Sequence, residues 1–86
     1  MLSQDRQRID EIDEQIVSLL EERYDCVSHI AKIKKDNHIP VFDTTREEAV
    51  LEKIRQMVSN EDYADSIVET FNQIMMVSKD YQKSKQ

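Results

Sequence analysis

Hydrophobic residues recur at steps of three and four positions from the start of the chain, which is the spacing of one face of an α-helix. This pattern predicts a first helix over about residues 3–36. Asn37 can take a left-handed C-terminal conformation and Pro40 stops a helix from continuing, so the helix is predicted to end near Asn37. The apolar stripe consists of Ile9, Ile12, Ile16, Leu19, Leu20, Val27, Ile30 and Ile33.

Two shorter helical stripes follow the first one. The second helix is predicted over about residues 44–59, where Thr44 and Glu47 have the form of a capping box and Asp43 is a competing N-cap. The third helix is predicted over about residues 62–83. The two stripes consist of Val50, Leu51, Ile54, Met57 and Val58, and of Ile67, Val68, Phe71, Ile74 and Met75.

The length of the first helix predicts a second copy of the chain. About 33 residues at ~1.5 Å each give a rod of roughly 50 Å. A compact chain of this length has a radius of gyration of only ~12 Å, so two shorter helices cannot cover the whole rod. Packing by two-fold symmetry is the simplest cover for the rest of the stripe. The predicted fold is therefore all-α, with three helices arranged in an intertwined homodimer.

Composition agrees with a single helical domain over residues 1–86. The chain has no Gly, one Pro and 35% charged residues, which leaves few turns and long helices. Its net charge of −6 gives no basic footprint for nucleic acid and no polybasic membrane surface. The single cysteine, Cys26, excludes an internal disulfide and fits a reducing compartment. With no apolar signal segment or membrane span in the sequence, we expect a cytoplasmic protein.

Polar residues interrupt the apolar stripes and predict a binding site. Arg23 and Lys34 lie three turns apart on the inward face of the first helix. Buried cations are rare and need partners, and Arg matches carboxylates in bidentate fashion. The sequence therefore predicts a positively charged pocket for a small polyanion, for which carboxylates fit best. The other helices contribute polar residues near the same stripes, namely Asp43, Arg46, Glu47, Ser78 and Gln82.

Arg6 lies seventeen residues before Arg23, which is roughly 25 Å along one helix. No small metabolite spans that distance. If Arg6 serves the pocket that holds Arg23, it must come from the other chain of an antiparallel pair.

Each of these residues also has an ordinary structural interpretation. Arg23 can reach solvent from the edge of its stripe or pair with a glutamate, and Lys34 suits the C-terminal end of a helix dipole. Asp43 and Glu47 are common in helix caps. The remaining side chains can lie on a solvated surface or on a fraying last turn, namely Arg6, Arg46, Ser78 and Gln82. No metal-ligand spacing is present, and neither a metal nor a cofactor is predicted.

From Arg6 to Gln82 the sequence resembles the all-helical class of chorismate mutases. The stretch from Ile12 to Arg23 has the family's I-D-x-x-I-x-x-L-L-x-x-R form, and Ala31 begins an A-x-x-K pattern that ends at Lys34. The loop segment PVFDTTRE resembles the P-V-x-D-x-x-R-E signature, and FNQIMMVSKDYQ carries Ser and Gln at the family's positions.

The resemblance implies an isomerase that rearranges chorismate to prephenate in the shikimate pathway, for phenylalanine and tyrosine synthesis. It implies catalytic roles for Lys34, Gln82 and Arg23, and a homodimer in which Arg6 crosses the interface. It also implies a substrate-binding set of Arg6, Arg23, Lys34, Asp43, Arg46, Glu47, Ser78 and Gln82.

Two alternatives remain open at this point. An isochorismate pyruvate-lyase of the same fold has similar Arg and Lys positions. It resembles this chain less in the loop segment that contains Asp43, Arg46 and Glu47. A non-catalytic helical dimerisation module would use the first helix as a plain coiled-coil arm. It leaves unexplained why polar residues of all three helices lie near inward stripes.

Overall fold

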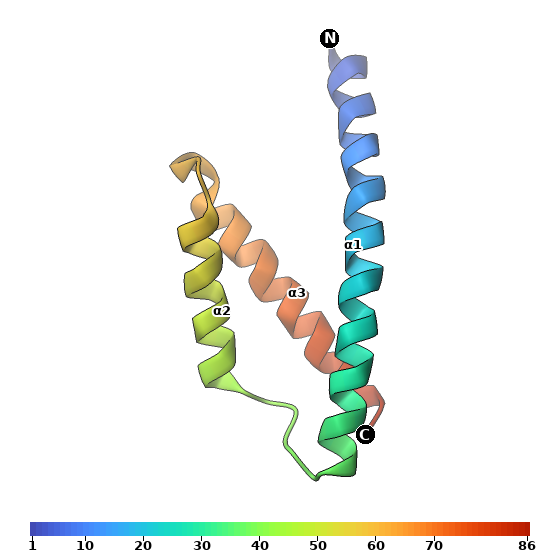
Figure 1. Ribbon diagram of the computed structural model, residues 1–86. Helices are drawn as coiled ribbons and strands as arrows, with labels where there is room; N and C mark the ends of the chain where they lie inside the picture. Colours follow the sequence, from blue (N-terminus) through green and yellow to red (C-terminus); the bar gives the residue numbers. More distant parts are fainter.

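The computed structural model describes residues 1–86 as three α-helices, α1 (Leu2–Asp36), α2 (Thr44–Met57) and α3 (Ala64–Ser84), with a short 3₁₀ turn, η1 (Glu61–Tyr63), before α3 (Figure 1). The predicted all-α fold with a very long first helix is confirmed. The chain measures 53 × 24 × 15 Å and its radius of gyration is 15.6 Å, so it is far more elongated than a compact domain of this size. No helix combines the length and the apolar character needed to cross a membrane.

The end of α1 at Asp36 confirms the predicted bound, but the left-handed residue lies one position later than expected. Asn37 keeps a right-handed backbone with φ −108°, and its side-chain amide donates to the Ile33 carbonyl at 2.8 Å. His38 takes the left-handed conformation instead, with φ 56°. The side chain of Asn37 thus closes the last turn, and the chain reverses at the following residue.

Of the two N-cap candidates in the sequence, Asp43 sets the start of α2, and the capping box of Thr44 and Glu47 does not form. The Arg46 backbone N–H donates to Asp43 Oδ1 at 3.0 Å, which satisfies one of the unpaired donors of the first turn. At its other end α2 stops at Met57, before the predicted residue 59, because Val58 is extended with ψ 124°.

The helix α3 packs against both other helices, whereas the backbones of α1 and α2 do not contact each other. The buried apolar side chains come from α1 and α3 and are Val27, Ala31, Ala64 and Met75. Tyr81 joins the same two helices, because its ring meets Tyr24 edge-on at 5.3 Å and its hydroxyl bonds Ser28 at 2.9 Å. The arrangement leaves a space over α3, between the C-terminal half of α1 and the start of α2.

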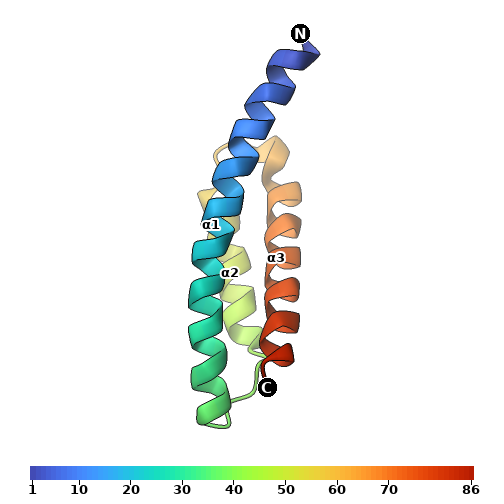
Figure 2. The same cartoon turned by 90° about the vertical axis from the view of Figure 1, so that its right-hand side faces the viewer.

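The N-terminal turns of α1 project beyond α2 and α3 (Figures 1 and 2). Large hydrophobic side chains on this arm lie exposed; Leu19, for example, is 63% exposed. The apolar stripe of α1 is therefore covered only where α3 crosses it. Its exposed members include Ile9, Ile12, Ile16 and Leu19.

Candidate active site

A cavity of about 390 Å³ occupies the space between α1 and α2, with α3 alongside. This volume lies in the range of small-molecule sites. Four cations and two carboxylates line it, so the cavity is positive although the chain carries a net charge of −6. The lining residues are Arg23, Val27, Ile30, Lys34, Val41, Asp43, Arg46, Glu47, Val50, Met75, Ser78, Lys79 and Gln82.

Arg23 reaches the cavity from α1 and is held there by α3. Its Nη1 donates to Ser78 Oγ at 2.8 Å, and Ser78 Oγ in turn donates to the Ile74 carbonyl at 2.8 Å. Ser78 is only 4% exposed. The Ser78 hydroxyl therefore holds the guanidinium in place, while the other N–H groups of Arg23 form no hydrogen bond within the chain.

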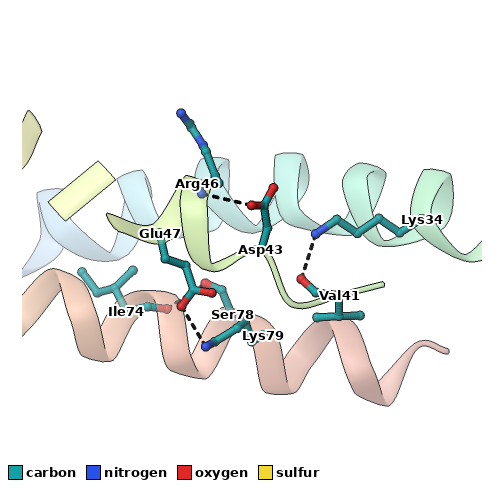
Figure 3. Close-up of polar contacts among 8 residues, drawn as sticks. All are labelled: Lys34, Val41, Asp43, Arg46, Glu47, Ile74, Ser78 and Lys79. Carbon is teal, nitrogen blue, oxygen red and sulfur yellow. Dashed lines mark hydrogen bonds and ion pairs between the residues drawn. The ribbon is translucent and has the colours of Figure 1, made fainter. Parts of the chain in front are cut away.

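Lys34 lies two turns beyond Val27 on α1 and points toward the loop that leads to α2. Its Nζ donates to the Val41 carbonyl at 3.0 Å (Figure 3). The ammonium group has three donors, so this bond leaves two of them available to a ligand in the cavity. Lys34 and Arg23 are both half-buried, as expected for cations at the edge of an apolar stripe.

The first turn of α2 brings Asp43, Arg46 and Glu47 to the opposite wall. Asp43 is exposed and engaged in capping, and the Arg46 side chain points away from the polar contacts in Figure 3. Glu47 is half-buried and turns inward, where its Oε1 accepts from Lys79 Nζ at 2.8 Å. The predicted capping role of Glu47 is thus replaced by a tertiary ion pair.

Gln82 lies one turn beyond Ser78 on α3 and is 8% exposed. Its Oε1 is completely enclosed and has no hydrogen-bond partner within the chain. Buried polar atoms are nearly always paired, so this enclosed acceptor needs a hydrogen-bond donor that the single chain does not supply.

The structure therefore brings together seven of the predicted site residues around one cavity, from all three helices and the loop between α1 and α2. Arg6 is the exception: it lies exposed on the projecting arm of α1, outside the cavity lining, and its side chain forms no hydrogen bond or ion pair within the chain.

Lys79 is the charged lining residue that the sequence pattern did not single out. It directly follows Ser78, which places it about 100° off the inward stripe of α3, where a lysine ordinarily faces water. A usable signal was present in its spacing, because Lys79 lies four residues after Met75 and three before Gln82, both of them inward.

The rest of the chain offers no metal-ligand cluster and one further hollow. No group of three or more His, Cys, Asp or Glu side chains is arranged to hold a metal ion. A second hollow of about 430 Å³ lies where α2 connects to α3, and no charged side chain lines it.

Comparisons with known proteins agree on one family. The sequence profile of the family described as chorismate mutase type II matches residues 5–83. The chorismate mutase of Methanocaldococcus jannaschii is 31% identical over 83 residues, covering 95% of this chain and 84% of the relative. No solved structure matches the chain.

Proposed function

The chain belongs to the chorismate mutase type II family and is an isomerase that converts chorismate to prephenate, and on that premise we propose that the cavity between α1 and α2 is its active site. The reaction belongs to the shikimate pathway, which leads to phenylalanine and tyrosine. The observation that carries the proposal is the convergence of Arg23, Lys34 and Gln82 on one cavity.

The chemistry explains why a site of this kind is sufficient. In a concerted [3,3] shift one C–O bond of the enolpyruvyl ether breaks while a C–C bond forms, so no atom is gained or lost. The chain must hold a compact, chair-like conformer, which is a proximity effect. It must also stabilise the negative charge that builds up on the ether oxygen. Neither task needs a nucleophile, a proton transfer or a cofactor.

Arginine side chains bind the two carboxylates in this proposal. Arg23 is already oriented by Ser78 at 2.8 Å, so little side-chain freedom is lost on binding. Arg46 lies on the opposite wall, and its guanidinium has no partner in the chain. Planar guanidinium groups suit carboxylates because they form two parallel hydrogen bonds.

Lys34 and Gln82 donate to the ether oxygen. Lys34 is positioned by its bond to the Val41 carbonyl and keeps two free donors. Gln82 adds a neutral amide, which donates without first having to be protonated. Glu47 and the Asp43 region accept from the ring hydroxyl, and Glu47 offers the carboxylate oxygen that Lys79 does not use.

A second copy of the chain completes the site. Arg6 is too far along α1 to reach the cavity of its own chain. The antiparallel α1 of a partner subunit would bring its own Arg6 to the open side of that cavity. The same packing covers the apolar arm of α1, where Leu19 is 63% exposed. Burial of such side chains is the main driving force of stable association. We therefore propose an intertwined homodimer with Arg6 shared across the interface.

The direct test is to follow the absorbance of chorismate after adding purified protein and to identify the product. The proposal predicts loss of chorismate with prephenate as the sole product, and loss of most activity in Arg23→Met. Glu21→Gln, an exposed change on the same helix, serves as the control. Isochorismate is assayed in parallel, since pyruvate release from it would favour the lyase alternative. A folded dimer that leaves chorismate unchanged would contradict the proposal.

A further inference from the structure

Lys79 is a cation in the cavity wall for which the mechanism above has no role. Its Nζ lies 2.8 Å from Glu47 Oε1, and the two side chains are only 20% and 22% exposed (Figure 3). The Lys79–Glu47 pair is the only ion pair of the chain in which both partners are largely shielded from water. The side chains of the three other pairs are about half exposed or more. A shielded pair of this kind is screened less by salt than a surface pair.

The position of Lys79 is fixed by a second contact. Its Nζ lies 4.9 Å from the centre of the Phe42 ring, a distance typical of a cation–π interaction. Lys83, one turn further along α3, lies 4.1 Å from the centre of the same ring and has no carboxylate partner. Phe42 directly precedes Asp43, so these lysines tie α3 to the loop that begins α2.

The ion pair determines what Glu47 can offer to a ligand. With Oε1 taken by Lys79, the other carboxylate oxygen has no partner in the chain and remains free to accept a hydrogen bond. Because the carboxylate is planar and is attached to α2 at its other end, holding one oxygen restricts the direction of the second. The ammonium also balances the negative charge of Glu47, which would otherwise repel an anionic substrate in the same cavity.

We propose that Lys79 is a positioning residue for the mutase reaction, acting on the substrate through Glu47 and aiming its free carboxylate oxygen at the ring hydroxyl. The inference rests on the proposed function of the cavity and adds a determinant of substrate recognition to it. Lys79 itself does not touch the substrate in this assignment.

The test is a double-mutant cycle in the full-length protein with four variants: Lys79→Met, Glu47→Gln, the combination of both, and Lys79→Arg. The hydroxyl contact is made in the ground state and in the transition state alike, so KM should rise about tenfold in Lys79→Met while kcat changes little. The double variant should be no worse than Glu47→Gln alone, because the lysine acts only through that carboxylate. Lys79→Arg should restore most of the lost affinity.

Lys83→Met is the matched control. It removes the other lysine from the Phe42 ring without touching Glu47, so KM should stay within about twofold of the wild type. A second readout uses two cyclic dicarboxylate inhibitors that differ only in the ring hydroxyl. Both inhibitors are anionic and lose the charge balance that Lys79 gives to Glu47, but only one of them uses the aimed oxygen, so Lys79→Met should weaken the hydroxylated inhibitor about tenfold more than the other.

Three results would overturn the assignment. Additive effects in the double variant would mean that Lys79 contacts the substrate directly. Equal weakening of both inhibitors would mean that Lys79 does not aim Glu47 at the ring hydroxyl. An unchanged KM with a lowered melting temperature would reduce Lys79 to a structural link between α2 and α3. If Lys79→Met does not fold, Lys79→Gln replaces it in the cycle. Wild-type turnover of chorismate is measured first, so a failure of the proposed function is recognised separately.

Discussion

Replacing Lys34 with methionine is the sharpest perturbation of the proposed chemistry. Methionine keeps most of the length and the apolar stem of the side chain but removes the ammonium group that lies 3.0 Å from the Val41 carbonyl. The helix around Lys34 is continuous from Leu2 to Asp36, so the backbone should not change. The variant therefore isolates the charge and its hydrogen bonds.

The expected loss follows from Coulomb's law. At ~3 Å and an effective dielectric constant of ~20, a pair of unit charges interacts by about 5.5 kcal/mol. If about half a charge develops on the ether oxygen, the ammonium stabilises the transition state by ~3 kcal/mol, as is typical for loss of one oxyanion donor. Lys34→Met should therefore lower kcat by about two orders of magnitude.

Steady-state kinetics provide the assay, with chorismate loss measured over a range of concentrations. Because the charge on the oxygen exists mainly in the transition state, kcat and kcat/KM should fall together while KM changes little. Lys35→Met is the matched control, since Lys35 is exposed on the same last turn and makes no side-chain bond. A rise in KM with kcat unchanged would refute the role, because it would make Lys34 a ground-state binding residue.

Two further predictions concern the amide of Gln82 and the cap of α2. Gln82→Glu should confine activity to acid pH, because the introduced carboxyl group donates only while protonated and loses that ability as the pH rises; a pH–rate profile like that of the wild type would contradict this. Asp43→Ala should remove the bond to the Arg46 N–H and destabilise the chain by about 1 kcal/mol, lowering the melting temperature by ~4–8 °C. Asp43→Asn keeps the capping oxygen and should melt near the wild type; equal melting of both variants would show that the cap contributes nothing.

The helices were predictable from local pattern because their apolar residues repeat at a single period. The ends of the helices were less predictable, because several residues can serve as the cap at each end. The residue types of Thr44 and Glu47 match a capping box, but in the structure Asp43 is the N-cap and Glu47 pairs with Lys79 of α3. Likewise Asn37 closes α1 with its side chain, and His38 supplies the left-handed residue.

The candidate site was predictable where a polar residue interrupts an apolar stripe, as Arg23 and Gln82 do. Lys79 was not predicted because it directly follows Ser78 and so lies off the apolar stripe of α3. Its inward direction depends on the carboxylate of Glu47 on α2. The proposed role of Arg6 was inferred from its distance to Arg23 along the first helix, and the structure of one chain does not test it because the proposed contact lies between subunits. Tertiary contacts thus decide what periodicity leaves open.

Subunit complementation tests the central claim most directly, namely that one cavity is completed by an arginine from a second copy. Arg6→Ala and Arg23→Ala are each expected to be nearly inactive as homodimers. When they are mixed and allowed to exchange subunits, each heterodimer regains one site with both arginines intact. Random exchange at equal amounts should then restore about a quarter of the wild-type activity. Activity that stays at the average of the two single variants, in a mixture proven to contain heterodimers, would contradict the account.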